Sequence, residues 1–194
     1  MGAPLTMIAC GILRKEIDFL IRKNHWAITP LFLPSGLHVD FEKLRHALEE
    51  CLRRHDRSAM LFYGACHPLM ERILEDAHCI RTPGQNCVEI YLGRELFDRE
   101  LAAGAFFLFE EWALHWDSII GGSQGMSPSV VADIFRSAHQ YLLAIRTPCS
   151  GDFTLQAKEI SRSTTLDLRW IDVGLEELER TLKATIRAAF KDAT

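Results

Sequence analysis

Short apolar runs alternate with amphipathic segments along most of this chain, and this alternation is what most constrains its fold. The first apolar run, residues 5–10, is followed by residues with helical spacing as far as residue 24. The same order returns with apolar runs at 26–33 and 58–63, followed by helical patterns at 41–52 and 69–76. Strands that alternate with helices form a mostly parallel sheet with helices on both faces. We therefore expect a three-layer α/β fold.

The second half of the chain continues the pattern less regularly. A short strand is expected at 78–81, and residues 87–92 fit either a strand or a helix, of which we favour the helix. We then expect a strand at 104–109, helices at 111–120 and 127–146, a strand at 166–171 and a terminal helix at 175–190. A chain of 194 residues with 48% hydrophobic content can bury a substantial core, so we expect one domain over residues 1–194.

Charge and cysteine usage narrow the class of protein. A net charge of -4 and the lack of any basic run disfavour a nucleic-acid partner. Six cysteines without the features of a signal peptide indicate a reducing cytoplasm in which thiols stay free. The longest apolar stretch, near residues 105–114, contains Glu110 and Glu111 and is much shorter than the roughly 20 residues that span a bilayer. We expect a soluble cytoplasmic protein with no membrane partner.

Three cysteines stand where a parallel sheet would gather them. Cys10 closes the first apolar run, Cys66 follows the third, and Cys87 ends a turn-rich stretch. The carboxyl ends of parallel strands form a ligand crevice at one edge of the sheet. Thiolates select zinc, copper(I) or iron-sulfur clusters, and three of them leave a fourth position for a substrate. The sequence thus predicts a metal site with a [4Fe-4S] cluster or Zn²⁺ as its cofactor.

The same cysteines allow a second interpretation, because free cysteine often packs as a small hydrophobe. No Cys-x-x-Cys occurs, and the spacing of the three matches no zinc-ribbon or ferredoxin pattern. Cys79 and Cys149 lie near expected breaks and remain alternative members of such a site. Core packing of isolated thiols therefore stays open.

Two histidines are candidate catalytic residues. His67 follows Cys66 and could act as a fourth ligand or a proton shuttle, and His38 lies in a loop at the same expected edge. Either could instead be structural, His67 leading a helix before Pro68 and His38 in a surface loop. A nucleophilic Cys66 assisted by His67 is a third interpretation, which the poor mutual orientation of adjacent side chains disfavours.

A different class of function is also open. The commonest motifs of nucleotide binding, serine hydrolysis and zinc proteolysis do not occur in the sequence. The rival to a metal protein is a metal-free accessory module that binds a small-molecule ligand or a partner protein with loops 35–38, 82–86 and 121–125. The aromatic residues at 106–116 and the terminal helix also carry enough apolar surface for a homodimer.

Several short segments form a recognisable set: Ile-Ala-Cys at 8–10, Gly-Leu-His at 36–38, Tyr-Gly-Ala-Cys at 63–66, Asn-Cys at 86–87, Leu-Gly at 92–93 and Ile-Asp-x-Gly at 171–174. Together they resemble the uncharacterised family DUF1638 over residues 5–175. The resemblance implies cysteines at Cys10, Cys66 and Cys87 and so favours these three over the other thiols. It also implies a place in corrinoid-linked or one-carbon methyl metabolism, with a corrinoid protein or methyltransferase as partner. It implies no settled activity, so whether the protein is an enzyme stays open.

Overall fold

The chain is organised as two compact units in the computed structural model, which describes residues 4–55, 59–77, 79–121 and 127–192. Unit 1 comprises Met1–Gly93 and Leu175–Thr194, and unit 2 comprises Arg94–Gly174. Each unit holds one sheet, and every strand pair described is parallel. The expected α/β class is confirmed, with its strands divided between two sheets. One domain over residues 1–194 stays a prediction, because two compact units can belong to one folding domain.

The sheet of unit 1 has the strand order β2-β1-β3-β4. Its strands are β1 (Leu5–Cys10), β2 (Ile28–Leu33), β3 (Ala59–Phe62) and β4 (Ile80–Arg81). Strand β1 is central, and its residues 7–10 are buried because helices cover both faces of a parallel sheet. Ala9 pairs with Phe62, so the residues that follow them, Cys10 and Tyr63, reach the carboxyl edge of the sheet together.

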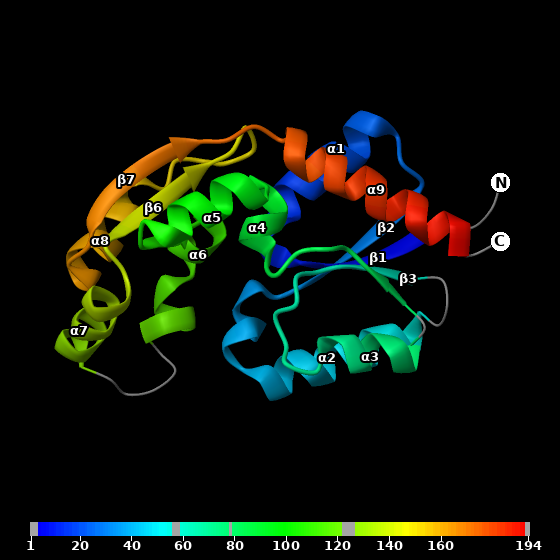
Figure 1. Cartoon of the computed structure of the whole chain (residues 1–194), viewed down its shortest axis with the longest axis horizontal. Helices are drawn as coiled ribbons and strands as arrows, with labels where there is room; N and C mark the ends of the chain where they lie inside the picture. Colours follow the sequence, from blue (N-terminus) through cyan, green and yellow to red (C-terminus); the bar gives the residue numbers. More distant parts are fainter. Residues whose placement is uncertain (1–3, 56–58, 78, 122–126, 193–194) are drawn as a thin grey trace. The chain divides into compact units, whose positions relative to one another are not determined.

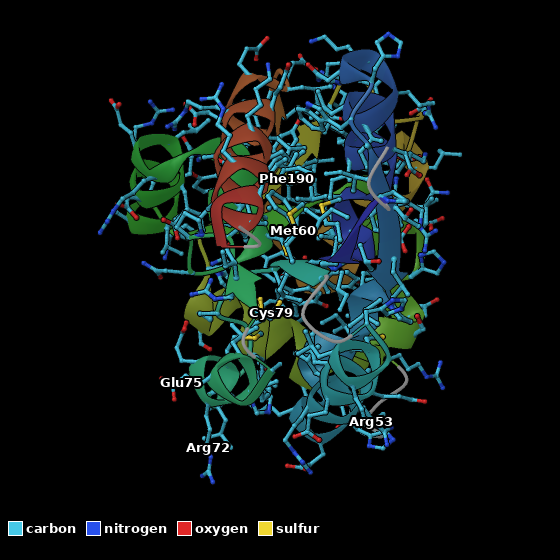
Figure 2. The ribbon with its side chains drawn as sticks, turned by 90° about the vertical axis from the view of Figure 1, so that its right-hand side faces the viewer. Arg53, Met60, Arg72, Glu75, Cys79 and Phe190 are labelled. Atoms are coloured by element: carbon cyan, nitrogen blue, oxygen red, sulfur yellow. The ribbon has the colours of Figure 1, made fainter. Side chains whose placement is uncertain are left out.

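Helices cover both faces of the unit 1 sheet. They are α1 (Arg14–Asn24), α2 (Phe41–Arg54), α3 (Met70–Ala77), α4 (Cys87–Leu92) and α9 (Glu176–Asp192), with 3₁₀ turns η1 (Gly11–Leu13) and η2 (Ser35–Val39). Figure 1 shows α1 and α9 on one face of the strands and α2 and α3 on the other. Figure 2 shows these layers end on: Met60 of β3 lies between Phe190 of α9 and Arg72 of α3, and Arg72 points away from the sheet.

Unit 2 is built in the same way around the strand order β5-β6-β7. Its elements are α5 (Arg94–Ala102), β5 (Ala105–Leu108), α6 (Glu110–Leu114), the π-helical turn η3 (Asp117–Gly121), α7 (Pro128–Ala138), β6 (Tyr141–Arg146), α8 (Thr154–Thr164) and β7 (Asp167–Asp172). Phe107 stacks on Phe97 of α5 with ring centroids 5.3 Å apart, whereas its neighbour Phe106 contacts Trp112 of α6 and Phe135 of α7. Because successive strand residues face opposite ways, helices lie on both faces of this sheet too.

The prediction of one long helix over 127–146 is wrong. Helix α7 ends at Ala138, His139 is extended with φ -134° and ψ 154°, and β6 begins at Tyr141. Strand β6 lies between β5 and β7 and buries its first five residues. A strand buried on both faces reads as a continuous apolar run, which periodicity cannot distinguish from a buried helix.

Other differences concern helices with weak apolar stripes. The helix expected at 111–120 ends at Leu114 and gives way to η3, and α5 and α8 were not predicted at all. Parts of three expectations lie outside the described residues: Ser58 and His78 at two strand starts, and residues 122–125 of the expected loop. No helix in the described parts of the chain is long and apolar enough to cross a membrane.

Candidate functional site

Three thiols meet at the carboxyl edge of the unit 1 sheet. Cys10 ends β1, Cys66 lies in the loop after β3, and Cys87 is the first residue of α4. The Cys87 thiol hydrogen-bonds with the thiols of both Cys10 and Cys66. Cys10 and Cys87 are 6% and 8% exposed, and Cys66 is half-buried. We call these three side chains the thiol cluster, and the structure places it where the topology of a parallel sheet predicts.

Gly64 makes this convergence possible. A Cβ at Gly64 would lie 2.3 Å from the Cα of Asn86, so only glycine lets the chain after β3 approach the chain before α4 so closely. The Ala65 N–H donates to the Gly84 carbonyl at 3.3 Å and joins the same two segments. This backbone contact places Cys66 beside Cys87.

Arg81 connects the same two segments through its guanidinium group. Its Nη1 donates to three backbone carbonyls, those of Thr82 (2.8 Å), Gly84 (3.1 Å) and Tyr63 (3.3 Å). Its Nη2 donates to the Glu71 carboxylate at 2.7 Å, and the side chain is only 15% exposed. The positive charge of Arg81 is also close enough to help lower the pKa of Cys66. Arg81 therefore joins the two loops and places a positive charge close to Cys66.

Hydrogen bonding divides the cluster into one donor and two acceptors. The pKa of Cys87 is raised well above its ordinary value because its thiol proton is shared with Cys10 and Cys66, and because the side chain is buried. Hydrogen bonding with Cys87 is the main cause that lowers the pKa of both Cys10 and Cys66, and it outweighs the opposing effect of burial. Negative charge in this cluster thus resides on Cys10 and Cys66 before Cys87.

The Tyr63 hydroxyl lies beside the thiol cluster, where it interacts with the Cys10 thiol. The side chain is 1% exposed, and its pKa is raised by burial and then by the neighbouring Cys10 and Cys87 thiols. The same interaction helps to lower the pKa of Cys10. Tyr63 therefore belongs to the immediate surroundings of the thiol cluster.

The thiol cluster is not a preformed ligand shell. In the parts of the chain that the structure describes, no group of three or more His, Cys, Asp and Glu side chains is arranged to hold a metal ion. The contacts run from Cys10 and Cys66 to Cys87 rather than around a common centre. Binding one ion would require rotation of these side chains. The donor set itself, three thiols in a buried edge, suits a thiophilic metal.

The structure describes the side chain of the candidate histidine His67, but not that of the candidate His38. The His67 ring is 6% exposed, accepts a hydrogen bond at Nδ1 from the Leu69 N–H at 2.9 Å, and packs edge-on against Phe41 at 5.7 Å. Since Nδ1 is an acceptor here, it is not available to a metal, and a neutral ring carries its proton on Nε2. The backbone of His38 lies in η2, and its side chain is outside the described part. A catalytic role for either stays a prediction.

The remaining cysteines occupy other places. The Cys79 thiol donates to the Ala59 carbonyl at 3.3 Å, and burial raises its pKa to about 11. Cys51 lies on α2, where partial burial also raises its pKa. Cys149 lies in unit 2, in the loop after β6. With its thiol bonded to a carbonyl of β3, Cys79 does not replace a member of the cluster.

Two residues of the site, Tyr63 and Arg81, were not predicted from the sequence. Tyr63 directly follows an apolar strand at the edge where ligands are expected, and Arg81 is a charged residue at the end of the half-buried strand β4. At both positions a polar residue at the end of a strand could have indicated a place in the site. Unit 2 also contains a cavity of about 570 Å³ lined in part by His115, Trp116 and Glu159, which no motif predicted.

Comparison with known proteins gives one match. A family model for DUF1638, described as a protein of unknown function, matches residues 32–182. The matched segment includes Cys66 and Cys87, and Cys10 precedes it. No curated protein and no solved structure matches the chain. The match covers well over half of the sequence and confirms the resemblance found from short segments, so the chain belongs to the DUF1638 family.

Proposed function

We propose that this protein binds a zinc ion or a [4Fe-4S] cluster through the thiolates of Cys10, Cys66 and Cys87, with one coordination position left for a ligand. The observation that supports the proposal is the contact of Cys87 with both other thiols at the carboxyl edge of the sheet. These three residues lie on three separate segments of the chain. Soft thiolate ligands favour these metals over magnesium or calcium.

The residues around the cluster would each have a part in such a site. Metal ligation requires thiolates, so Cys87 would lose the proton that it shares with its neighbours. The positive charge of Arg81 would offset part of the negative charge of three thiolates. Gly64 would keep the Cys66 and Cys87 loops in contact. Bound zinc would activate a substrate thiol by lowering its pKa, whereas a cluster would transfer electrons or bind substrate at its unique iron.

Anaerobic purification followed by elemental analysis and an absorption spectrum tests this function and distinguishes the two metals. We expect about one zinc per chain, or about four irons with the broad visible absorption of a [4Fe-4S] cluster. Protein purified without metal, which also takes up neither zinc nor iron and sulfide and leaves all three thiols open to alkylation, would refute the proposal.

We place this site in corrinoid-linked or one-carbon methyl metabolism, in the cytoplasm, with a corrinoid protein or a methyltransferase as partner. The support is the membership of the DUF1638 family together with six free cysteines, which suit a reducing compartment. Gel filtration of the metal-loaded protein with a purified corrinoid protein, monitored by light scattering, tests the partner and shows whether the protein forms a homodimer. Separate elution at micromolar concentrations would contradict this partner.

A metal-free binding module is the second candidate, and one observation favours it. Phe41 and Leu69 are 52% and 49% exposed and both contact His67, next to Cys66. An apolar surface at the sheet edge suits a partner or small molecule. Unchanged binding of that partner after replacement of all three cluster cysteines by serine would favour this candidate.

A further inference from the structure

A cavity of about 570 Å³ lies in unit 2 between α6, η3, α7 and α8. The strand order β5-β6-β7 follows the chain, so right-handed crossovers place the helices of both connections on the same face of the sheet. The floor of the cavity is apolar and is formed by residues that belong to the core of unit 2 or pack against it: Trp116, Ile120, Val131 and Ile160. Cavities that hold ligands measure about 300 to 1,000 Å³, so this one suits a small organic molecule.

Exposed polar side chains form the rim of the cavity, and three of them have their protons bonded within the chain. The Ser118 hydroxyl donates to the His115 carbonyl at 2.7 Å, and the Ser163 hydroxyl donates to the Ile160 carbonyl at 3.0 Å. The His115 ring donates from Nδ1 to the Glu111 carbonyl at 2.9 Å, so a neutral ring keeps its lone pair on Nε2. These three groups therefore offer lone pairs to a ligand.

The rim also carries negative charge. Asp117 and Glu159 line the cavity, whereas no lysine or arginine does so among the described residues. No hydrogen bond or ion pair joins either carboxylate to another described residue. Two carboxylates beside three further acceptors make the rim complementary to a cation that donates hydrogen bonds.

We infer that this cavity binds a small organic cation, with its ammonium group at the Asp117 and Glu159 carboxylates and its apolar part on the cavity floor. An ammonium group has three donors and no acceptor, which matches the rim. An anionic ligand would instead place its charge beside two carboxylates. The site lies in unit 2 and uses no residue of the thiol cluster, so it goes beyond the proposed function and its test does not depend on metal binding.

Isothermal titration calorimetry of the full chain with tryptamine and with indole-3-propionate tests the inference. The two probes share an indole ring and a two-carbon chain, and they differ in ending with an ammonium or a carboxylate group. We expect tryptamine to bind with a Kd below about 1 mM and about tenfold or more tightly than indole-3-propionate.

The double substitution Asp117→Asn and Glu159→Gln should raise the tryptamine Kd by about tenfold, since each exposed carboxylate contributes up to about fivefold in affinity. The matched control is Glu95→Gln with Asp98→Asn on α5, which removes the same charge outside the cavity and should change the Kd by less than about twofold. Unfolding midpoints measured in parallel show that both variants fold. Absence of tryptamine binding to the wild type, equal affinity for the two probes, or equal changes of Kd in the two variants would overturn the inference.

Discussion

At the scale of single residues, the thiol cluster consists of three cysteines whose neighbours in the sequence form no known metal-binding motif. Cys10 and Cys66 could be assigned to one edge from the sequence because each follows an apolar strand. The central position of Cys87 could not be predicted, because hydrogen bonds between thiols depend on distances of a few tenths of an ångström.

The Tyr141 hydroxyl should contribute to stability through one charge-assisted hydrogen bond. It donates to the Glu100 carboxylate at 2.7 Å, so Tyr141→Phe should lower the free energy of unfolding by about 1.5 kcal/mol. Urea denaturation measures the change. A loss below about 0.5 kcal/mol would show that this hydrogen bond makes no net contribution to stability.

Gly64 should tolerate no side chain. Gly64→Ala places a methyl group against the backbone of Asn86, which cannot move aside without separating the two cysteine-bearing loops. We expect a loss of about 3 kcal/mol in the free energy of unfolding, at the upper end for overpacking, together with weaker metal binding.

Gly151→Ala in unit 2 is the matched control for this substitution. Its Cβ would lie 2.9 Å from Oε1 of Glu110, the end of a flexible side chain that can rotate away. The expected loss in the free energy of unfolding is below about 1 kcal/mol. Equal losses at the two glycines, measured by the same denaturation, would contradict the close backbone contact.

At the scale of elements, an ion-pair network joins α1 to α9. Glu179 of α9 accepts from Lys183 at 2.6 Å and from Lys23 of α1 at 2.9 Å, and these lysines lower its pKa from 4.5 to about 2. A folded-state pKa below the unfolded one means that this contribution to stability is complete above about pH 4.5 and is lost as the pH falls towards 2.

Glu179→Gln should therefore lower the free energy of unfolding by about 1 kcal/mol at pH 7 and weaken its dependence on pH between 4.5 and 2. Thermal unfolding followed across this pH range measures the effect. The control is Glu177→Gln, since this carboxylate pairs with Arg180 on the same helix. Wild-type and Glu179→Gln curves that stay parallel as the pH falls would contradict the assignment.

The elements also show where sequence patterns fail. Strand β1 was predicted because it is a short apolar run, and helix α9 was predicted because it has a clear apolar stripe. Strand β6 was mistaken for helix because Tyr-Leu-Leu-Ala-Ile is apolar on every side. Helix α8 was missed because serines, threonines and charged residues interrupt its apolar face. Burial on both faces removes the periodicity on which such predictions depend.

At the scale of the whole molecule, the division into two units makes a prediction about where function resides. Leu142 of β6 is fully buried in the core of unit 2, which includes Leu108, Phe153 and Ile160. Leu142→Ala should cost about 3 kcal/mol in the free energy of unfolding. The folded variant should retain the metal content of the wild type, because the thiol cluster lies in unit 1. Loss of metal from this variant while it remains folded would show that the site depends on unit 2.

The central claim is that Cys10, Cys66 and Cys87 bind one metal centre, and the six cysteines provide a balanced test of it. One variant replaces these three by serine, and the other replaces Cys51, Cys79 and Cys149. Both are purified anaerobically and their zinc and iron contents per folded chain are measured. We predict that the first variant contains no bound metal and that the second matches the wild type. Equal metal content in the two variants would contradict the account.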